Sequence, residues 1–479
     1  MKKVILSLAL CCICISGRAI EAQDATIKNR VIILTDVENE PDDAESLVRL
    51  MLYTNEIDVK GIIATTSTHM RNRVAPETIH KIVTAYGKVR DNLLLHKSGY
   101  PSEEYLHSII KTGPKVYGMM ALKEKKTSEG AAWIMKELQE NDNRPLWICA
   151  WGGINTLAQA LQQLKQTLPA KKLDQAIAKL RIYTISDQDD TGIWIRKNYP
   201  HLFYIVSPGG YGNATWAGIM ATAPGADNEK VSNKWLRENI QQGHGPLGAC
   251  YPDVAYGMEG DTPSWLNLIP NGLSYPEHPN WGGWGGRYEY YKPKREDCDL
   301  NGFNGGVPIE EEPHAIWTNA IDTFHPTVAR EAGCAIGEDS LTIKGYQPTV
   351  WRWRTEMQND FAARMAWCTK SYKDANHAPI AKLDHPNEMK VKAGSTFLLS
   401  AESCTDPDGD NLSYQWIYYP EAGTYKKDVK MQGSKNIHHI YVEAPEVKKK
   451  DTLHFILKVT DKGTPALSSY QRIIVTVEP

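Results

Sequence analysis

The chain of 479 residues contains few phenylalanines, only 6, and has no large excess of charge of either sign. Its 54 Lys and Arg nearly balance its 57 Asp and Glu, so it offers no net basic field for nucleic acid or anionic lipid. We therefore expect no nucleic-acid partner. The 14 Trp and 23 Tyr far outnumber Phe, and rings with a polar group are common at wet surfaces such as those that contact sugars.

Motifs of several common enzyme classes are also missing. The sequence has no Gly-x-Gly-x-x-Gly after a predicted strand, no Gly-x-x-x-x-Gly-Lys-Ser/Thr and no Gly-x-Ser-x-Gly. Dinucleotide enzymes, NTPases and serine hydrolases are therefore disfavoured. The cysteines after residue 22 match no zinc-binding spacing and are sparse for a disulfide scaffold.

Residues 1–22 have the pattern of a secretory signal peptide, with two lysines, an apolar run over 4–15 and small residues up to Ala22. A lipoprotein anchor is the alternative, because three cysteines lie within the apolar run. No later segment has the roughly 18–20 continuous apolar residues of a membrane span. We expect an exported protein, periplasmic or extracellular, without a transmembrane segment.

From residue 29 to about 202, short β-branched runs alternate with helical patterns, which predicts an α/β domain with a mainly parallel sheet flanked by helices. The predicted strands are 31–35, 59–65, 146–150, 180–186 and 202–206. The predicted helices, whose apolar residues recur every three or four positions, are 44–52, 76–86, 129–138, 155–164 and 173–180. From about 216 to 325 the pattern gives way to a Trp- and Gly-rich insertion, and long irregular segments of this kind are often functional.

The composition changes again near residue 376, and short alternating strands separated by Gly and Asp turns follow. The clearest predicted strands are 396–400, 412–418, 453–459 and 473–477, typical of an Ig-like β-sandwich. Trp416 is expected in its core. The expected organisation is thus a signal peptide over 1–22, an α/β domain over 28–372 and a sandwich over 377–479.

The segment Thr35-Asp-Val-Glu-Asn-Glu-Pro-Asp-Asp-Ala44 lies between the first strand and the first helix and is rich in carboxylates. One or two acids would suffice to cap the helix, and Pro41 suits its first turn. Further acids packed close together raise one another's pKa unless a cation neutralises them. Hard oxygens without nearby His or Cys favour Ca²⁺ or Mg²⁺, so a metal site and a structural cap are the two interpretations.

This segment resembles the nucleoside hydrolases, whose first strand ends in an Asp-x-Asp-x-x-x-Asp-Asp signature that holds Ca²⁺. Trp147-Ile-Cys-Ala-Trp-Gly-Gly-Ile-Asn155-Thr-Leu-Ala158 is similar to the family's strand that ends in Gly-Pro-Leu-Thr-Asn-Leu-Ala. Glu259-Gly-Asp261-Thr-Pro263 resembles the loop that carries the last carboxylate ligand. Together with Trp281-Gly-Gly-Trp-Gly-Gly-Arg-Tyr288 and the sandwich, these motifs resemble secreted bacterial proteins described as cellulose-binding, whose first domain is nucleoside hydrolase-like.

The resemblance implies a hydrolase of N- or O-glycosyl bonds. It implies Ca²⁺ held by the side chains of Glu38, Asp43 and Asp261 and by the Asn155 carbonyl. Asp36 or Asp42 would take a proton from the water that attacks the anomeric carbon. The sugar would pass through an oxocarbenium-like state that nearby carboxylates stabilise.

The sequence also departs from the nucleoside hydrolases. Gly260 stands where those enzymes commonly have a His that helps the base to leave, and Glu38 and Glu40 replace Asp and Gly. These differences disfavour a purine leaving group. An O-glycoside or oligosaccharide fits an exported, Trp-rich protein better.

Several further residues are candidates for substrate binding. Asp189 and Asp190 follow a predicted strand at the edge where open α/β sheets bind ligands, although both could simply cap the next helix. His69 could line the same pocket or make ordinary hydrogen bonds. Six residues of the insertion could form a sugar-stacking wall or the core of a folded loop: Trp265, Trp281, Trp284, Arg287, Tyr288 and Tyr290.

The sequence leaves two main hypotheses. The first is a secreted, Ca²⁺-dependent hydrolase that acts on a carbohydrate or nucleoside. The second is a non-catalytic protein that binds a cellulose-type polysaccharide and keeps the acidic residues as a metal or sugar clamp. A third possibility is that the acidic cluster only supports folding.

Overall fold

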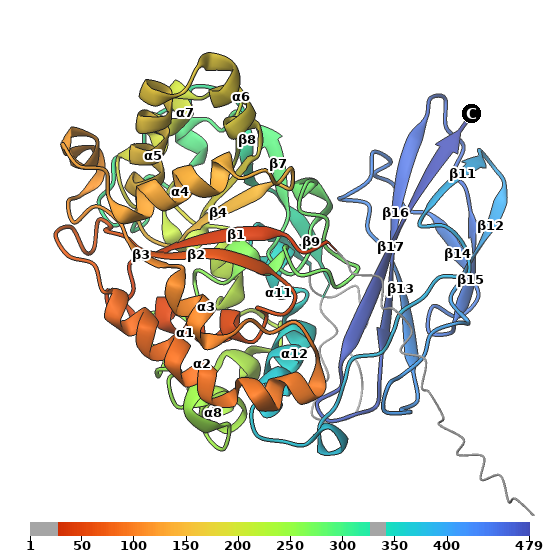
Figure 1. The fold of residues 1–479 in the computed structure, drawn as a ribbon. Helices are drawn as coiled ribbons and strands as arrows, with labels where there is room; N and C mark the ends of the chain where they lie inside the picture. The colour runs from red at the N-terminus through yellow and green to blue at the C-terminus, as the bar shows by residue number, and fades with distance from the viewer. Residues whose placement is uncertain (1–26, 326–341) are drawn as a thin grey trace, which may run out of the picture.

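A mainly parallel sheet organises the first part of the computed structural model, which describes residues 27–325 and 342–479 (Figure 1). The predicted signal peptide over 1–22 lies outside the described residues. The strand order is β3-β2-β1-β4-β5-β6-β8-β7, and only the last pair, β8 and β7, is antiparallel. The strands are β1 (Arg30–Thr35), β2 (Asp58–Ala64), β3 (Ile110–Thr112), β4 (Leu146–Ala150), β5 (Leu180–Thr184), β6 (Phe203–Val206), β7 (Tyr288–Tyr291) and β8 (Ile316–Asn319).

Helices cover both faces of this sheet because alternate residues of its central strands are buried on opposite sides. Ile33 of β1 packs in one core with α1, α2 and α12, whereas Ile32 and Leu34 pack in the other with α4, α5, α6 and α7. The helices are α1 (Pro41–Met51), α2 (Pro76–His96), α3 (Glu103–Ser108), α4 (Glu129–Gln139), α5 (Asn155–Thr167), α6 (Ala170–Ala178), α7 (Thr191–Asn198), α8 (Asn233–Leu236), α9 (Gly245–Gly248), α10 (Pro263–Leu266), α11 (Pro348–Trp351) and α12 (Arg354–Ala366). The predicted α/β class is confirmed.

The last part of the chain forms two facing antiparallel sheets, as predicted for a sandwich. One has the order β11-β17-β16-β13 and the other β12-β15-β14; within the first, β11 alone pairs in parallel. Trp416 is buried between them with 1% exposure. The strands are β11 (Glu388–Lys392), β12 (Thr396–Ser400), β13 (Ser413–Tyr418), β14 (Lys430–Gln432), β15 (His439–Glu443), β16 (Asp451–Thr460) and β17 (Ser468–Glu478). A short hairpin of β9 (Asp322–Phe324) and β10 (Ile343–Gly345) lies outside both sheets.

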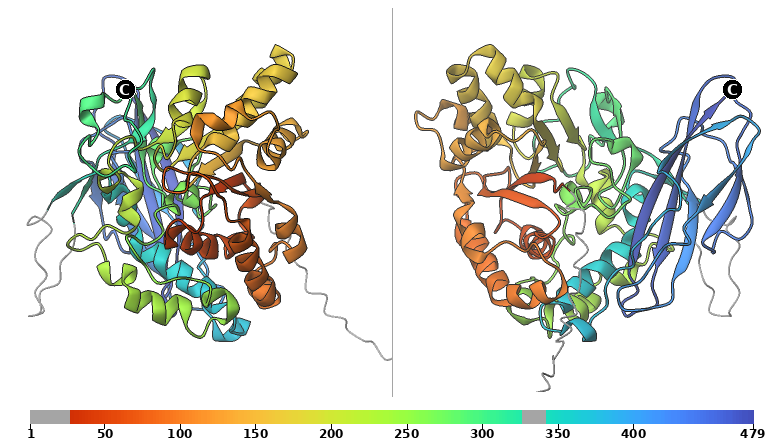
Figure 2. Two further views of the ribbon diagram at one scale, coloured as in Figure 1. Left: turned by 90° about the vertical axis from the view of Figure 1, so that its left-hand side faces the viewer. Right: turned by 45° about the vertical axis from the view of Figure 1, so that its right-hand side comes forward.

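The sandwich stands beside the α/β part with β16 and β17 turned toward it (Figure 2). Tyr470 of β17 accepts a hydrogen bond from the Trp284 indole at 3.3 Å. Arg472 of the same strand donates to the carbonyls of Leu273 and Gly282 at 3.0 Å each. These groups are buried, so the Trp- and Gly-rich insertion forms part of the contact between the two parts. Helix α12 adds to it, because Asn359 donates to the Ala466 carbonyl at 2.8 Å. The predicted boundary between 372 and 377 falls between α12 and β11 and stays a prediction.

Within the described residues, no helix combines the length and the apolar character needed to cross a lipid bilayer.

Candidate functional site

The acidic segment lies where the carboxyl ends of the parallel strands meet. β1 ends at Thr35, the next residues turn, and α1 begins at Pro41, whose fixed φ suits the first helical position. Acidic residues in the first turn of α1 also suit the positive end of its helix dipole. The strand and the helix thereby hold Asp36, Asp42 and Asp43 at one edge of the sheet.

Asp261 joins this group from a distant loop directly before α10. Each of Asp42, Asp43 and Asp261 offers a carboxylate oxygen, and the three oxygens lie within 4.8 Å of one another. The Thr35 hydroxyl donates to Asp43, and the Asp43 amide donates to Oδ1 of Asp42 at 3.1 Å. Asp261 therefore converges on the opening acidic turn, as the metal-site interpretation requires.

Burial and mutual repulsion raise the pKa of all these carboxyls. Asp42 has its pKa raised to about 7, first by burial and then by the charges of Glu40 and Asp36. For Asp43 and Asp261 the same two causes raise the pKa well above the usual range. Burial also raises the pKa of Asp36, although Ser67 and His69 oppose the change. A site of this kind favours a bound cation, because a cation offsets the repulsion.

The hydrogen bonding agrees with a cation site. Oδ2 of Asp36 and Oδ2 of Asp261 are buried and find no hydrogen-bond partner among the described residues. Such orphaned acceptors are rare in proteins and call for an explanation such as an ion. The donors are carboxylate oxygens without imidazole or thiolate, the set that suits Ca²⁺ or Mg²⁺. The residues present thus fit the calcium that the sequence resemblance to nucleoside hydrolases implies.

Behind these acids, a buried ion pair fixes the loop that carries Asp261. Nε of Arg49 in α1 lies 2.6 Å from Oε2 of Glu259, and neither side chain has any exposed surface. Tyr251 donates to Oε1 of Glu259 at 2.7 Å, and Thr262 donates to its Oε2 at 2.9 Å. Glu259 adopts a left-handed φ of 49°, unusual for a residue with a side chain, and these contacts hold it there. Sequence reasoning missed this network, since nothing near Arg49 marks its partner more than 200 positions away.

The loop also passes very close to the acids at Gly260. A Cβ atom at this position would lie 3.0 Å from Oδ2 of Asp42 and 3.0 Å from the Trp216 ring. A histidine here, as nucleoside hydrolases commonly have, would have to displace one of them. The packing around Gly260 therefore disfavours the histidine that nucleoside hydrolases commonly have at this position.

The other two expected metal ligands are Glu38 and the Asn155 carbonyl. Oε2 of Glu38 pairs with Arg73 at 2.9 Å, Thr78 donates to its Oε1, and its side chain is 42% exposed. This pairing holds the pKa of Glu38 below its usual range, mainly through Thr78 and Arg73. Glu38 is not part of the convergent group. Asn155 is buried at the start of α5, where its side chain donates to Thr66 at 2.9 Å and to the Val116 carbonyl at 2.8 Å; that its backbone carbonyl binds the ion stays a prediction.

Asp189 and Asp190 are occupied by hydrogen bonds to the backbone. Asp189 accepts from the amide of Thr191 at 2.8 Å and from that of Asn155 at 3.0 Å, and Asp190 accepts from the amide of Met119 at 2.8 Å. Burial raises the pKa of Asp189 to about 6 against the lowering effect of Thr191. Asp189 thus bonds the start of α7, as the capping alternative predicts, whereas the Asp190 side chain makes no capping hydrogen bond to that helix.

The expected sugar-stacking wall needs correction, because most of its residues are packed inside the protein. Trp265 is fully buried against Tyr53, with ring centroids 5.5 Å apart, and Trp284 is 2% exposed at the contact with the sandwich. Trp281 stacks on His278 at 4.0 Å. Arg287 is also buried, and its Nε pairs with Asp322 at 2.6 Å. Trp281, Trp284 and Arg287 contact the sandwich. Tyr288 is buried, and Tyr290 is 59% exposed.

A different aromatic group lies beside Asp36. His69 packs against Tyr211 and Phe303, with ring centroids 6.2 and 5.8 Å away, and Tyr211 packs against Trp216 at 5.6 Å. Burial raises the pKa of Tyr211, and the charges of Asp36 and Glu40 add to this effect. Phe303 is 69% exposed. Tyr211 and Trp216 follow β6 at the carboxyl edge of the sheet, a position that could have marked them in the sequence.

Family comparisons match both parts of the chain. The nucleoside hydrolase-like domain of cellulose-binding Sde182 matches residues 30–288, and the C-terminal domain of cellulose-binding protein Sde0182 matches residues 396–477. No curated protein matches the chain.

Solved structures add a long match. A nucleoside hydrolase-related hypothetical protein from Saccharophagus degradans, described as associated with carbohydrate metabolism, is 32% identical with a TM-score of 0.78. The match covers 94% of this chain and 100% of that one. The effector protein XOO4466 is 11% identical with a TM-score of 0.32, over 51% of this chain and 81% of its own.

Proposed function

Because this chain belongs to the family of cellulose-binding Sde182 proteins with a nucleoside hydrolase-like domain, we propose that it is a calcium-dependent hydrolase of glycosyl bonds. The observation that carries the proposal is the convergence of Asp42, Asp43 and Asp261 at the carboxyl edge of the sheet. The substrate we propose is an O-glycoside, since the family is named for cellulose binding and Gly260 leaves no histidine for a leaving base.

Asp42, Asp43 and Asp261 would hold the cation, with their oxygens already gathered within 4.8 Å. Bound calcium would supply a fixed position for sugar hydroxyls and an attacking water, and it would acidify that water. Asp36 would accept the water's proton, because its Oδ2 is buried beside the group and has no partner among the described residues. The Arg49–Glu259 pair would keep Asp261 in place.

The sugar ring would rest against Tyr211 and Phe303. Aromatic faces suit the C–H face of a pyranose, and the exposed Phe303 ring lies 5.5 Å from Tyr211. Phe303→Ala should weaken binding of soluble cello-oligosaccharides while calcium binding stays unchanged. Phe303→Tyr, which keeps the ring, is the matched control and should bind as the wild type does. Equal binding by all three proteins would rule out this aromatic subsite.

The hydrolase proposal is tested by separating metal binding from turnover. Calcium binding to the chelator-treated protein is measured by calorimetry, and turnover is measured on a panel of nucleosides and β-glucans. Asp261→Asn should lose both calcium binding and turnover, whereas Asp36→Asn should keep calcium binding and lose turnover. Asp91→Asn, at a fully exposed acid of the same domain, is the control and should keep both. Wild type that binds no calcium would overturn the proposal.

A second candidate is a carbohydrate-binding protein without turnover. It is favoured because the nearby acids that could protonate a leaving group are engaged elsewhere: Glu38 with Arg73, and Asp189 and Asp190 with backbone amides. Wild type with no turnover on the whole panel, together with calcium-dependent retention on cellulose that Asp43→Asn abolishes, would support this candidate.

A further inference from the structure

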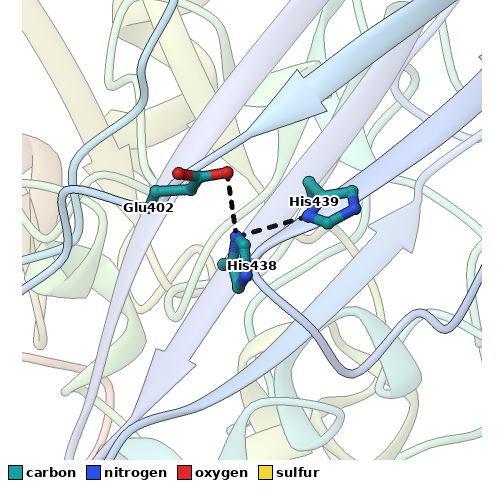
Figure 3. A group of neighbouring side chains, drawn as sticks. All are labelled: Glu402, His438 and His439. Carbon is teal, nitrogen blue, oxygen red and sulfur yellow. Dashed lines mark hydrogen bonds and ion pairs between the residues drawn. The ribbon is translucent and has the colours of Figure 1, made fainter.

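A second group of metal-binding side chains lies in the C-terminal sandwich (Figure 3). Glu402 follows β12 by two residues, and His438 and His439 stand at the start of β15. These strands are antiparallel with Ser400 opposite His439, and the Ala401 amide donates to the His438 carbonyl at 2.8 Å. The register of the two strands therefore brings the three side chains together at one end of the sheet.

All three ligand atoms lie within 4.8 Å of one another, and two of the distances match a tetrahedral site. Nδ1 of His438 lies 3.3 Å from Nδ1 of His439 and 3.5 Å from Oε1 of Glu402. Zinc bonds of about 2.0–2.2 Å at tetrahedral angles would place two ligand atoms roughly 3.3–3.5 Å apart. Two imidazole nitrogens that face each other can share only one proton, in a long hydrogen bond, whereas a cation between them uses both lone pairs. The geometry thus suits an ion better than a hydrogen bond.

The donor set differs from that of the acidic group in the α/β part. Two imidazoles and one carboxylate select Zn²⁺ or a similar transition metal over Ca²⁺ and Mg²⁺. The side chains are 65% exposed for Glu402 and 42% exposed for His438, so solvent can reach the ion and supply a fourth ligand. We propose that Glu402, His438 and His439 form a binding site for a divalent transition metal such as Zn²⁺.

The turn that carries Glu402 is held by a neighbouring acid. Asp384 accepts hydrogen bonds from the Ser400 hydroxyl at 2.8 Å, from the Glu402 amide at 2.6 Å and from the Ser403 hydroxyl at 2.5 Å. Such support around a ligand lowers the cost of arranging it for metal binding. An ion here would tie the end of β12 to the start of β15, so its binding should stabilise the sandwich.

The test uses the full chain freed of metal. Zinc binding is measured by calorimetry, and the Tm is followed with ZnCl₂ and, separately, with CaCl₂. We expect zinc, but not calcium, to act through this site. His438→Gln and His439→Gln should each weaken zinc binding at least about tenfold, judged from the effect of residues around metal ligands, and should remove the zinc-dependent rise in Tm. Glu402→Gln, at a side chain that is 65% exposed, should also weaken zinc binding, because it removes the carboxylate ligand.

Two controls separate this site from others. His201→Gln, at an exposed histidine of the α/β part, should bind zinc as the wild type does. Asp261→Asn should also bind zinc at the site in the sandwich, although it loses calcium binding at the acidic site. Absence of zinc binding by the wild type, or wild-type binding by both His438→Gln and His439→Gln with normal circular dichroism, would overturn the proposal.

Discussion

Replacing Arg49 by Met should strongly destabilise the α/β part. The substitution keeps much of the side-chain volume but leaves Glu259 charged, with no exposed surface and without the cation 2.6 Å away. Breaking a buried pair in this way costs about 3–5 kcal/mol. At roughly 2–4 °C per kcal/mol, the Tm should fall by at least about 6 °C, measured by far-ultraviolet circular dichroism. Calcium should also bind more weakly, because Asp261 is two residues from Glu259.

A matched control exists at the surface. Arg73 and Glu38 make the same kind of pair at 2.9 Å, but their side chains are 53% and 42% exposed. Arg73→Met should therefore change the free energy of unfolding by less than about 1 kcal/mol. The double variant Arg49→Met/Glu259→Gln should regain part of the loss, since it removes the stranded charge. An Arg49→Met protein as stable as Arg73→Met would refute this reasoning.

Three further predictions concern the sandwich and its contact with the α/β part. Burial, together with the nearby charges of Arg472 and Lys426, lowers the pKa of His454 to about 3. The neutral His454 therefore contributes fully to the free energy of unfolding above about pH 6.5, and this contribution is lost as the pH falls toward 3. Between pH 6.5 and 4, unfolding titrations should give wild type a steeper loss of stability than His454→Gln, by up to about 1.4 kcal/mol per pH unit. Trp416→Ala should lower the free energy of unfolding of the sandwich by about 3–5 kcal/mol in denaturant titrations, because it empties a buried site. Asp322→Ala removes the buried carboxylate that pairs with Arg287 at 2.6 Å and with Arg352 at 2.8 Å, and it should lower the Tm measured by calorimetry.

Local patterns sufficed to predict much of the fold. The run at 31–35 is apolar on both faces, as a central parallel strand must be, and it became β1. Strands at the margin were missed: β3 has three residues, and β7 lies in the Trp- and Gly-rich insertion with three of its four residues exposed. Helix α12 was missed as well. Its buried residues mix the apolar Met357, Phe361 and Met365 with polar ones, Arg354, Gln358 and Arg364, so the apolar stripe by which a helix is recognised is interrupted.

The site was predictable only where its residues are adjacent in the chain or carry a motif. Asp42 and Asp43 follow a strand directly, and Asp261 was identified through resemblance to a family loop. The ion pair behind them joins residues 49 and 259, and composition carries no signal for such a contact. The Trp residues were misjudged for a related reason, because sequence alone does not tell an aromatic ring at a sugar site from one at a contact between domains.

One segment connects the acidic site to the sandwich. It begins with Asp261, continues through α10, where Ser264 accepts a hydrogen bond from Trp151 at 2.9 Å, and ends in the turns at Gly282 and Trp284 against the sandwich. Gly282 has a φ of 75°, and a Cβ there would lie 2.9 Å from the Tyr419 hydroxyl, so the approach of the two parts depends on a glycine. The sandwich therefore braces the far end of the loop that carries Asp261. We therefore expect the second module to help to fix the position of Asp261 through this segment.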